Sequence, residues 1–364
     1  MLGAVFKSIA DWRVHTAVDL SRILTHCFSQ LPFAVLHGLK ALIMRTPDMP
    51  KRYVFLLLDG FSPMGFNCAL ETLAHVNRHK TNRTYYSWRI LSERSTHAIG
   101  WNGIHIACDD GLVSLYPDET LVVVGGENIL DATTKPLLNW LRREARKGID
   151  IGAISSAVYP LAKAGLLHKR HATTHWEYHA TMTETLLDVQ ILDNIFDDDG
   201  KIFTCAGGAS CMDLMLHRIT KDYGEELAFW VADQMIYSAP RTSTNAQRMS
   251  VLNKTGVRHV KLAQTVDLMW ANLEDPIPPS ELADVIGLST RQLERLFQRY
   301  LETSPKKYYL SLRLEKARNL LRQTPMPIID IAVACGFESP SHFSKCYKKH
   351  YGTLPSRERA FETQ

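Results

Sequence analysis

Two short segments near the end of the chain carry side chains that could donate hydrogen bonds to base edges or to phosphates. The Arg guanidinium can bond bidentately to guanine O6 and N7, whereas Lys acts more as a point charge. Helical periodicity places these polar residues away from the apolar face of each segment, where water or DNA can reach them. The side chains are Arg291, Gln292, Arg295, Ser341, His342 and Lys345.

These segments are diverged copies of one pattern, ELADVIGLSTRQLERLFQRYLETSP and DIAVACGFESPSHFSKCYKKHYGTLP. Gly287 corresponds to Gly336 at an offset of 49 residues, and Phe297 corresponds to Tyr347 at an offset of 50. Each copy predicts a helix-turn-helix, in which a short helix, a turn bearing glycine and a second amphipathic helix follow one another. A single copy would be explained equally well by a helical hairpin with a solvated basic face. The repetition favours a paired reader of DNA.

Local signals define the helices that would position these side chains. Ser289 and Gln292 form a capping-box pattern, and Ser339 is a plausible N-cap followed by Pro340 at the first helical position. The intervening stretch predicts a connecting helix. A rod of about 15 residues spans about 22 Å and could hold two recognition helices in successive major grooves, about 34 Å apart. Its predicted apolar face comprises Leu310, Leu314, Ala317 and Leu321.

The charge balance is compatible with binding to DNA but does not establish it. The whole chain has a net charge of +4 with 22% charged residues, so it is not a bulk polycation. From residue 281 onward, 14 Lys and Arg stand against 9 Asp and Glu, a local charge of +5. This excess would allow phosphate contacts and a salt-dependent affinity.

The last 90 residues, roughly, resemble the AraC/XylS family of transcription activators. The stretches RLEKARNLL and IIDIAVACGFESPSHFSKCYKKHYGTLPSRER carry this resemblance. It implies that the six polar side chains named above read bases in double-stranded promoter DNA, with Arg295 and Lys345 at equivalent positions. It also implies a homodimer, RNA polymerase as a partner, and activation of transcription.

An alternating pattern of strands and helices begins at Tyr53. The short apolar runs YVFLLL, YYSWRIL, LVVVGG and IDIGAIS predict strands, and helices are expected near Asn67–Arg78 and Lys135–Lys147. The expected fold is a flavodoxin-like α/β sandwich with a mainly parallel sheet, followed by an all-α domain with two helix-turn-helix motifs. VQILDNIF and KIFTCAGG flank Asp197–Gly200 and predict a hairpin, because this acidic cluster lacks the full spacing of a calcium loop.

The sandwich resembles the class I glutamine amidotransferase-like domains that some AraC-type regulators carry. The motifs are VVVGGENI, GAISSAVYPLAKAGLLHKRHATTHW and FTCAGGASCMDLMLHRI. In the enzymatic members a Cys lies on the turn after the GAI-type strand, a His follows about twenty residues later, and a Glu follows the first strand. Here these positions hold Ser155, His175 and, near the acidic position, Gly65. We therefore expect no catalysis; the alternative is an amidase or amidotransferase that uses Ser155 and His175.

A pocket that has lost its nucleophile can still bind a ligand at the carboxyl ends of parallel strands. The resemblance implies a small metabolite, often an amino acid or a methylated amine, and an aromatic wall would suit a quaternary ammonium group. His175 could instead be a half-buried histidine bonded to backbone, and Phe61 and Trp176 could be core residues. No cofactor and no metal site are expected. The predicted lining is Phe61, Met64, Asn67, Gly126, Ser155, His175 and Trp176.

The predicted organisation has four parts, with the clearest boundary at the proline-rich break Asp275–Pro279. The helix Leu227–Ile236 could mediate self-association or could simply pack against the body. The parts are 1–50, a helical extension of unknown role; 51–218, the ligand-sensing sandwich; 219–274, a helical connector; and 275–364, the DNA-binding domain.

Cysteine usage and hydropathy suggest a cytoplasmic protein with no membrane contact. The 7 Cys include no C-x-x-C pair, and the apolar run Leu31–Met44 is too short to span a bilayer. No cleavable signal sequence is evident. The leading hypothesis is a DNA-binding regulator that responds to a metabolite. The competing hypotheses are the enzyme already mentioned and a constitutive DNA-binding protein whose sandwich only dimerises.

Overall fold

The computed structural model describes residues 49–79, 83–94, 96–238, 240–245, 247 and 259–360. The predicted extension of residues 1–50 therefore lies outside the described residues, apart from its last two. All features described belong to the unit that begins at Pro50.

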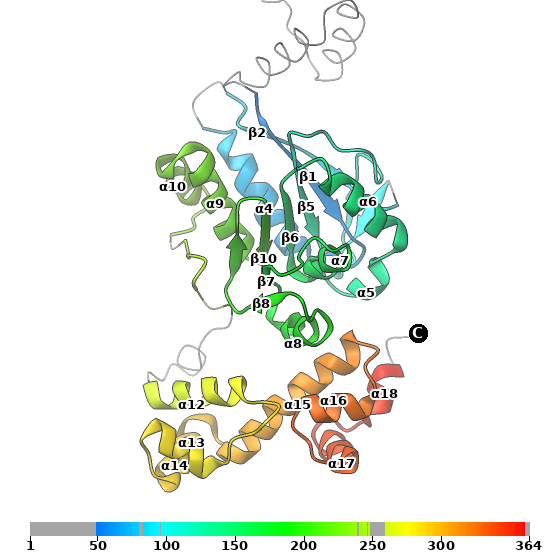
Figure 1. The fold of residues 1–364 in the computed structure, drawn as a ribbon. Coiled ribbons are helices and arrows are strands. Elements are labelled where there is room, and N and C mark those ends of the chain that lie inside the picture. The colour runs from blue at the N-terminus through cyan, green and yellow to red at the C-terminus, as the bar shows by residue number, and fades with distance from the viewer. Residues whose placement is uncertain are drawn as a thin grey trace, which may run out of the picture. The chain divides into compact units, whose positions relative to one another are not determined.

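A six-stranded sheet forms the centre of the sandwich, and its strands are parallel except for β9 (Figure 1). The predicted mainly parallel sheet is thus confirmed. The chain runs from β1 outward to β2 and then returns past β1 to β5, so the strand order reverses between β1 and β5. Open α/β sheets bind ligands at such a reversal. In spatial order the strands are β2 (Tyr86–Leu91), β1 (Lys51–Leu57), β5 (Glu119–Val124), β6 (Ile151–Ile154), β10 (Ile202–Cys205) and β9 (Phe196–Asp198).

Helices cover both faces of this sheet (Figure 1). Successive residues of β1 point to opposite faces: Phe55 and Leu57 join one buried cluster, whereas Val54 and Leu56 join the other. This double burial explains why the strands are continuous apolar runs rather than alternating ones. One face carries α4 (Pro63–Val76), α9 (Ser210–Tyr223) and α10 (Glu225–Gln234), and the other carries α5 (Ile129–Ala132), α6 (Lys135–Ala145) and α7 (Val158–Lys163).

The predicted connector of residues 219–274 is divided between two cores. Leu227 and Val231 of α10 pack in the same buried cluster as the strands of the sandwich. Further along, α12 (Val260–Ala271) packs against the first helix-turn-helix. Within α10, Phe229 remains 60% exposed.

The predicted hairpin forms, but only from β9 and β10, which pair antiparallel around the turn. The stretch VQIL before β9 contributes β8 (Gln190–Leu192), which instead pairs parallel with β7 (His171–Thr173). Asp199 Oδ1 accepts hydrogen bonds from the Ile202 backbone N–H at 2.7 Å and from that of Lys201 at 3.0 Å. The acidic cluster thus closes a turn, and the described residues contain no group of three side chains suited to holding a metal ion. A further small hairpin joins β3 (His97–Ile99) to β4 (His105–Ala107).

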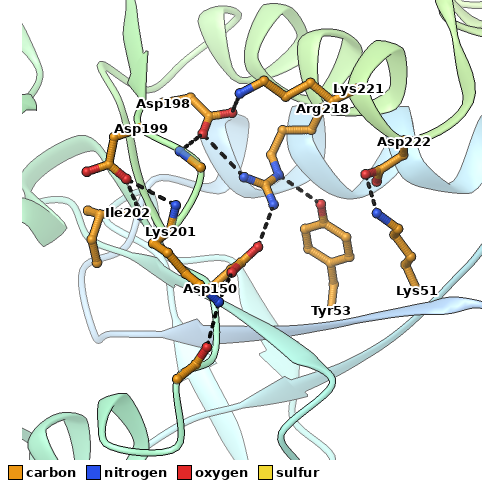
Figure 2. A network of polar contacts seen from close by, with 12 residues as sticks. Lys51, Tyr53, Asp150, Asp198, Asp199, Lys201, Ile202, Arg218, Lys221 and Asp222 are labelled. Atoms are coloured by element: carbon orange, nitrogen blue, oxygen red, sulfur yellow. Dashed lines mark hydrogen bonds and ion pairs between the residues drawn. The ribbon is translucent and has the colours of Figure 1, made fainter. Parts of the chain in front are cut away.

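A polar network ties α9 to the sheet, as Figure 2 shows. Arg218 donates to Tyr53 Oη at 3.2 Å and to Asp150 Oδ2 at 3.2 Å, and its second terminal nitrogen lies 3.5 Å from Asp198. Lys221 donates to the same Asp198 carboxylate at 2.9 Å. Burial by itself would raise the pKa of Asp198, but the hydrogen bonds from His217 and Lys221 and the charge of Arg218 hold it below the ordinary value.

The C-terminal region is entirely helical in its described residues, which confirms the predicted all-α domain. Two helix-turn-helix units lie at the two ends of α15 (Figure 1). None of the described helices is long and apolar enough to cross a membrane. The helices are α13 (Pro279–Ile286), α14 (Thr290–Leu301), α15 (Pro305–Gln323), α16 (Ile328–Ala334), α17 (Pro340–Tyr351) and α18 (Pro355–Ala360).

Candidate functional site

Ser155 occupies a sharp turn at the carboxyl end of β6. Its φ is +61°, a left-handed conformation that is unusual for a residue other than glycine, and its side chain is buried. A short 3-10 turn then leads into α7, so the local geometry is strand, strained turn and helix. Unrelated hydrolases use the same geometry to present a nucleophile. The structure therefore retains the elbow although serine stands at the nucleophile position.

The turn is held by close backbone packing and buried hydroxyls. A Cβ on Gly126 would lie 2.0 Å from the Gly60 carbonyl oxygen, so only glycine fits there. Ser156 Oγ donates to the Gly126 carbonyl at 2.6 Å, and Thr174 Oγ1 donates to the Ser155 carbonyl at 2.9 Å. The Gly125 N–H donates to the Ile154 carbonyl at 3.1 Å, so this backbone donor is already used within the sheet.

The base and the acid of a catalytic triad are not assembled at this elbow. His175 is the N-cap of α8 (Trp176–Thr185), where its Nδ1 accepts from the Glu177 N–H at 3.4 Å and lies 3.6 Å from the Glu177 carboxylate. Burial lowers the pKa of His175, against the opposing charge of Glu177. At the acidic position, a Cβ on Gly65 would already lie 3.0 Å from Ile154 Cγ2. Gly65 thus offers no carboxylate at the acidic position, and a side chain there would require Ile154 to shift.

The predicted effector residues fall into three groups. Gly126 and Ser155 lie at the elbow, where Ser156 bonds the Gly126 carbonyl and Thr174 bonds the Ser155 carbonyl, and His175 and Trp176 follow Thr174 with their rings 5.5 Å apart between centroids. Phe61 is fully buried among core side chains, where it contacts Phe66 at 6.0 Å between ring centroids. The remaining two, Met64 and Asn67, are exposed on α4.

Sequence reasoning missed a groove at the carboxyl ends of β1 and β2. Its volume is about 440 Å³. Asp59 Oδ2 lies 2.6 Å from Arg94 Nε within it, and Thr134 Oγ1 donates to Glu93 at 2.7 Å. Polar residues directly after two predicted strands were the available signal. The lining is Leu57, Leu58, Asp59, Gly60, Ser92, Glu93, Arg94, Asn128, Asp131, Ala132 and Thr134.

The first recognition helix, α14, begins with the predicted capping box. Ser289 accepts from the Gln292 N–H at 3.3 Å, and the Gln292 side chain accepts from the Ser289 N–H at 2.8 Å. Leu293 and Phe297 are fully buried, which turns the opposite face outward. All three predicted reading residues of this helix are exposed: Arg291, Gln292 and Arg295.

The second recognition helix, α17, is built in the same way. Ser339 accepts from the His342 N–H at 3.3 Å, and Pro340 takes the first helical position. Phe343 and Tyr347 form the buried face. Ser341, His342 and Lys345 are all exposed, so both helices present the predicted side chains to the surroundings.

The helix α15 joins the two units through two buried clusters. Tyr309 and Leu312 pack in the first cluster, whereas Leu314 and Ala317 pack in the second. Arg313 anchors the turn of the second unit, because its guanidinium donates to the carbonyl oxygens of Cys335 at 2.8 Å and Gly336 at 2.5 Å. Each half of the rod therefore holds one helix-turn-helix.

Comparison with known proteins agrees with this architecture. A helix-turn-helix domain family matches residues 282–360, and the DJ-1/PfpI family matches residues 51–221. The chain is 39% identical to the HTH-type transcriptional regulator CdhR of Pseudomonas aeruginosa over 86% of this chain and 92% of that protein. It is 33% identical to the HTH-type transcriptional regulator GlxA of Rhizobium meliloti over 84% of this chain and 94% of that protein. The crystal structure of an AraC family transcriptional regulator from Pseudomonas putida covers 51% of this chain and 100% of its own, with 24% identity and a TM-score of 0.46.

This chain belongs to the AraC-type transcriptional regulators that carry a DJ-1/PfpI domain. Its helix-turn-helix domain binds DNA, and both recognition helices expose the polar side chains predicted for that role. The relatives are named as regulators, which agrees with the incomplete triad at Ser155.

Proposed function

We propose that this protein acts in the cytoplasm as an activator that responds to a small metabolite, such as an amino acid or a methylated amine. The metabolite binds at the carboxyl ends of the parallel strands and changes how the paired helices engage a promoter. The protein works as a homodimer and contacts RNA polymerase. It performs no chemistry on the metabolite.

The observation that carries the sensing proposal is the elbow without a triad. Its strained turn, buried hydroxyls and adjacent aromatic rings support a shaped site, and the acidic position holds Gly65 in place of a carboxylate. Ser155, His175 and Trp176 are the side chains expected to contact the metabolite, with Met64 and Asn67 at the rim. Gly126 would shape the site by allowing the close backbone approach there, and Phe61 would support it from the core.

The helix α8 offers a physical route from the elbow to the DNA-binding helices. It starts at the elbow, where the Tyr178 hydroxyl donates to the Gly126 carbonyl at 2.9 Å. Further along, Thr181 Oγ1 donates to Gln323 Oε1 on α15 at 2.7 Å. Glu184 Oε1 lies 3.3 Å from Lys316 Nζ on the same rod. A ligand that shifts α8 would therefore bias α15, provided that it binds one arrangement more tightly than the other.

The competing enzyme hypothesis makes an opposite prediction at Ser155. Replacement of Ser155 by Ala should leave DNA binding in the absence of metabolite within about twofold of the wild type and should at most weaken the response to the metabolite, because no bond is broken at the hydroxyl. A hydrolytic turnover of amide substrates by the wild type that disappears in Ser155→Ala would establish the enzyme instead.

The proposal is tested by capturing genomic promoter fragments with the full-length protein and by thermal unfolding against a panel of amino acids and methylated amines. We expect a defined operator and at least one compound that raises the unfolding midpoint, an effect that Ser155→Trp removes by filling the elbow. Specific DNA binding with no response to a broad panel would support the constitutive alternative. Absence of specific DNA binding would refute regulation itself.

A further inference from the structure

The groove between the ends of β1 and β2 and the loop after β5 has the position of a ligand site. It lies where the strand order reverses between β1 and β5. Open α/β sheets bind ligands at this crevice because the loops on either side diverge there. Its volume of about 440 Å³ is within the range of small-molecule sites.

The walls of the groove combine an apolar floor with charges of both signs. Leu57 and Leu58 form a buried floor, and their chain leads directly into Asp59. The lining includes three carboxylate residues, Asp59, Glu93 and Asp131, and one guanidinium, that of Arg94, which is paired with Asp59. Glu93 is bonded by Thr134 at 2.7 Å, and Asp59 is bonded by the Ile99 N–H at 3.3 Å, so both carboxylates are held in place.

We infer that this groove binds a small aminocarboxylate that carries an additional cationic group. This inference rests on the proposed sensing function and gives it a second site with a defined ligand chemistry. The ligand's ammonium or guanidinium groups meet the carboxylates of Asp59, Glu93 and Asp131. The ligand's carboxylate accepts charge-assisted hydrogen bonds from Arg94. Arg94 gives up its ion pair with Asp59 to make them.

The excess of carboxylates in the groove favours a ligand with a net positive charge. A dicarboxylate would meet three negative charges and gain only Arg94, whereas a cation gains attraction from each of them. Because the groove is open to water, each charge contact contributes modestly and weakens with salt. We therefore expect a weak site, filled at metabolite concentrations rather than at trace levels.

Titration calorimetry of the full-length protein with three probes of similar length tests this inference. The probes are L-ornithine, 1,4-diaminobutane and glutarate. We expect ornithine to bind, diaminobutane to bind more weakly, and glutarate not to bind. Glu93→Gln and Asp131→Asn should each weaken ornithine about three- to tenfold, since each removes one charge while retaining the shape of the side chain. Arg94→Gln should weaken ornithine, which loses its carboxylate partner, but should not weaken diaminobutane, which loses a repulsive neighbour.

Glu226→Gln, which removes an exposed carboxylate on α10, is the matched control and should leave all three affinities unchanged. Ornithine binding that survives Glu93→Gln and Asp131→Asn but is lost in Ser155→Trp would locate the ligand at the elbow, which overturns this inference and keeps the proposed function. Absence of heat with both amines would also overturn it. Capture of promoter DNA is a separate measurement, so failure of the regulatory role would be recognised independently.

Discussion

Single residues show how the sandwich keeps its shape while its chemistry has changed. At the elbow, the strained backbone of Ser155 persists although the triad is incomplete. A strained turn of this kind costs about 1 to 3 kcal/mol and survives only when its surroundings hold it. Here Gly126 and Thr174 supply that support, through a close backbone approach and a buried hydrogen bond.

The carboxylate of Asp198 should make stability depend on pH. Its folded-state pKa is depressed, so its contribution is present above the unfolded value of about 4 and is lost as the pH falls below that value. Asp198→Asn should lower the free energy of unfolding by about 2 kcal/mol at pH 7. The difference from the wild type should narrow as the pH falls from about 4 to 3. Denaturant unfolding across this range is the measurement.

Asp188→Asn is the control for this series because its carboxylate is 65% exposed. It should be nearly neutral at every pH. A gap between wild type and Asp198→Asn that stays constant down to pH 3 would show that Asp198 is not held ionised by its neighbours.

Side chains on the recognition helices that contact bases should affect DNA binding differently from those that contact phosphates. Arg295→Ala should cost about 1 to 3 kcal/mol on the preferred operator and relax the preference at one base. Lys349→Ala should weaken all sequences alike and reduce the slope of affinity against salt by about 1. Affinity measurements on operator and scrambled DNA separate the two. Equal losses on both DNAs for Arg295→Ala would refute its base-reading role.

Periodicity was sufficient to identify these exposed residues, because burial of Leu293 and Phe297 fixes the outward face of α14. The groove residues could not be found in this way. Asp59 and Arg94 lie 35 positions apart in the sequence, and only the pairing of β1 with β2 brings them to one edge of the sheet. Likewise, the sequence motif identifies Ser155 and His175 but cannot show that the His175 ring caps its own helix.

At the level of elements, helix α15 joins the two recognition helices into one DNA-binding unit. Arg313 extends from its middle to the turn of the second unit and lies over the Phe337 ring at 4.2 Å. Lysine cannot donate both bonds of the guanidinium fork. Arg313→Lys should therefore destabilise the protein by about 1 to 2 kcal/mol and weaken DNA contacts of α17 more than those of α14.

Arg299→Lys, an equivalent change at an exposed position on α14, controls for this substitution in the stability measurement. Thermal unfolding gives the stability, and protection of DNA bases across the operator gives the contacts of each helix. Equal weakening of both halves of the operator would contradict the anchoring role of Arg313.

Hydrophobic patterning predicted most elements but not their partners. The run VQIL has the composition of a hairpin strand, yet β8 pairs with β7 because only β9 lies in register with β10 across the turn. The apolar residues of α10 were compatible with self-association or with packing on the body, and Leu227 and Val231 pack on the sandwich. The type of a side chain indicates whether it is buried, and the tertiary contacts determine which element it packs against.

At the scale of the whole molecule, regulation requires that ligand binding in the sandwich change the free energy with which the helix-turn-helix domain binds DNA. The pair Glu184–Lys316 joins α8 to α15 and is partly buried. Glu184→Lys and Lys316→Glu should each weaken this contact, whereas the double variant restores opposite charges. We expect a coupling energy of about 1 kcal/mol in a double-mutant cycle on unfolding of the full chain. Additive effects would show that this contact carries no coupling.

Two recognition helices held by one rod should read two successive major grooves on one side of the duplex. Hydroxyl-radical footprinting on a captured operator measures this arrangement. We expect two protected segments about 10 base pairs apart on the same face, and a loss of about tenfold or more in affinity when 5 base pairs are inserted between them. A single protected segment, or an affinity indifferent to the insertion, would contradict it.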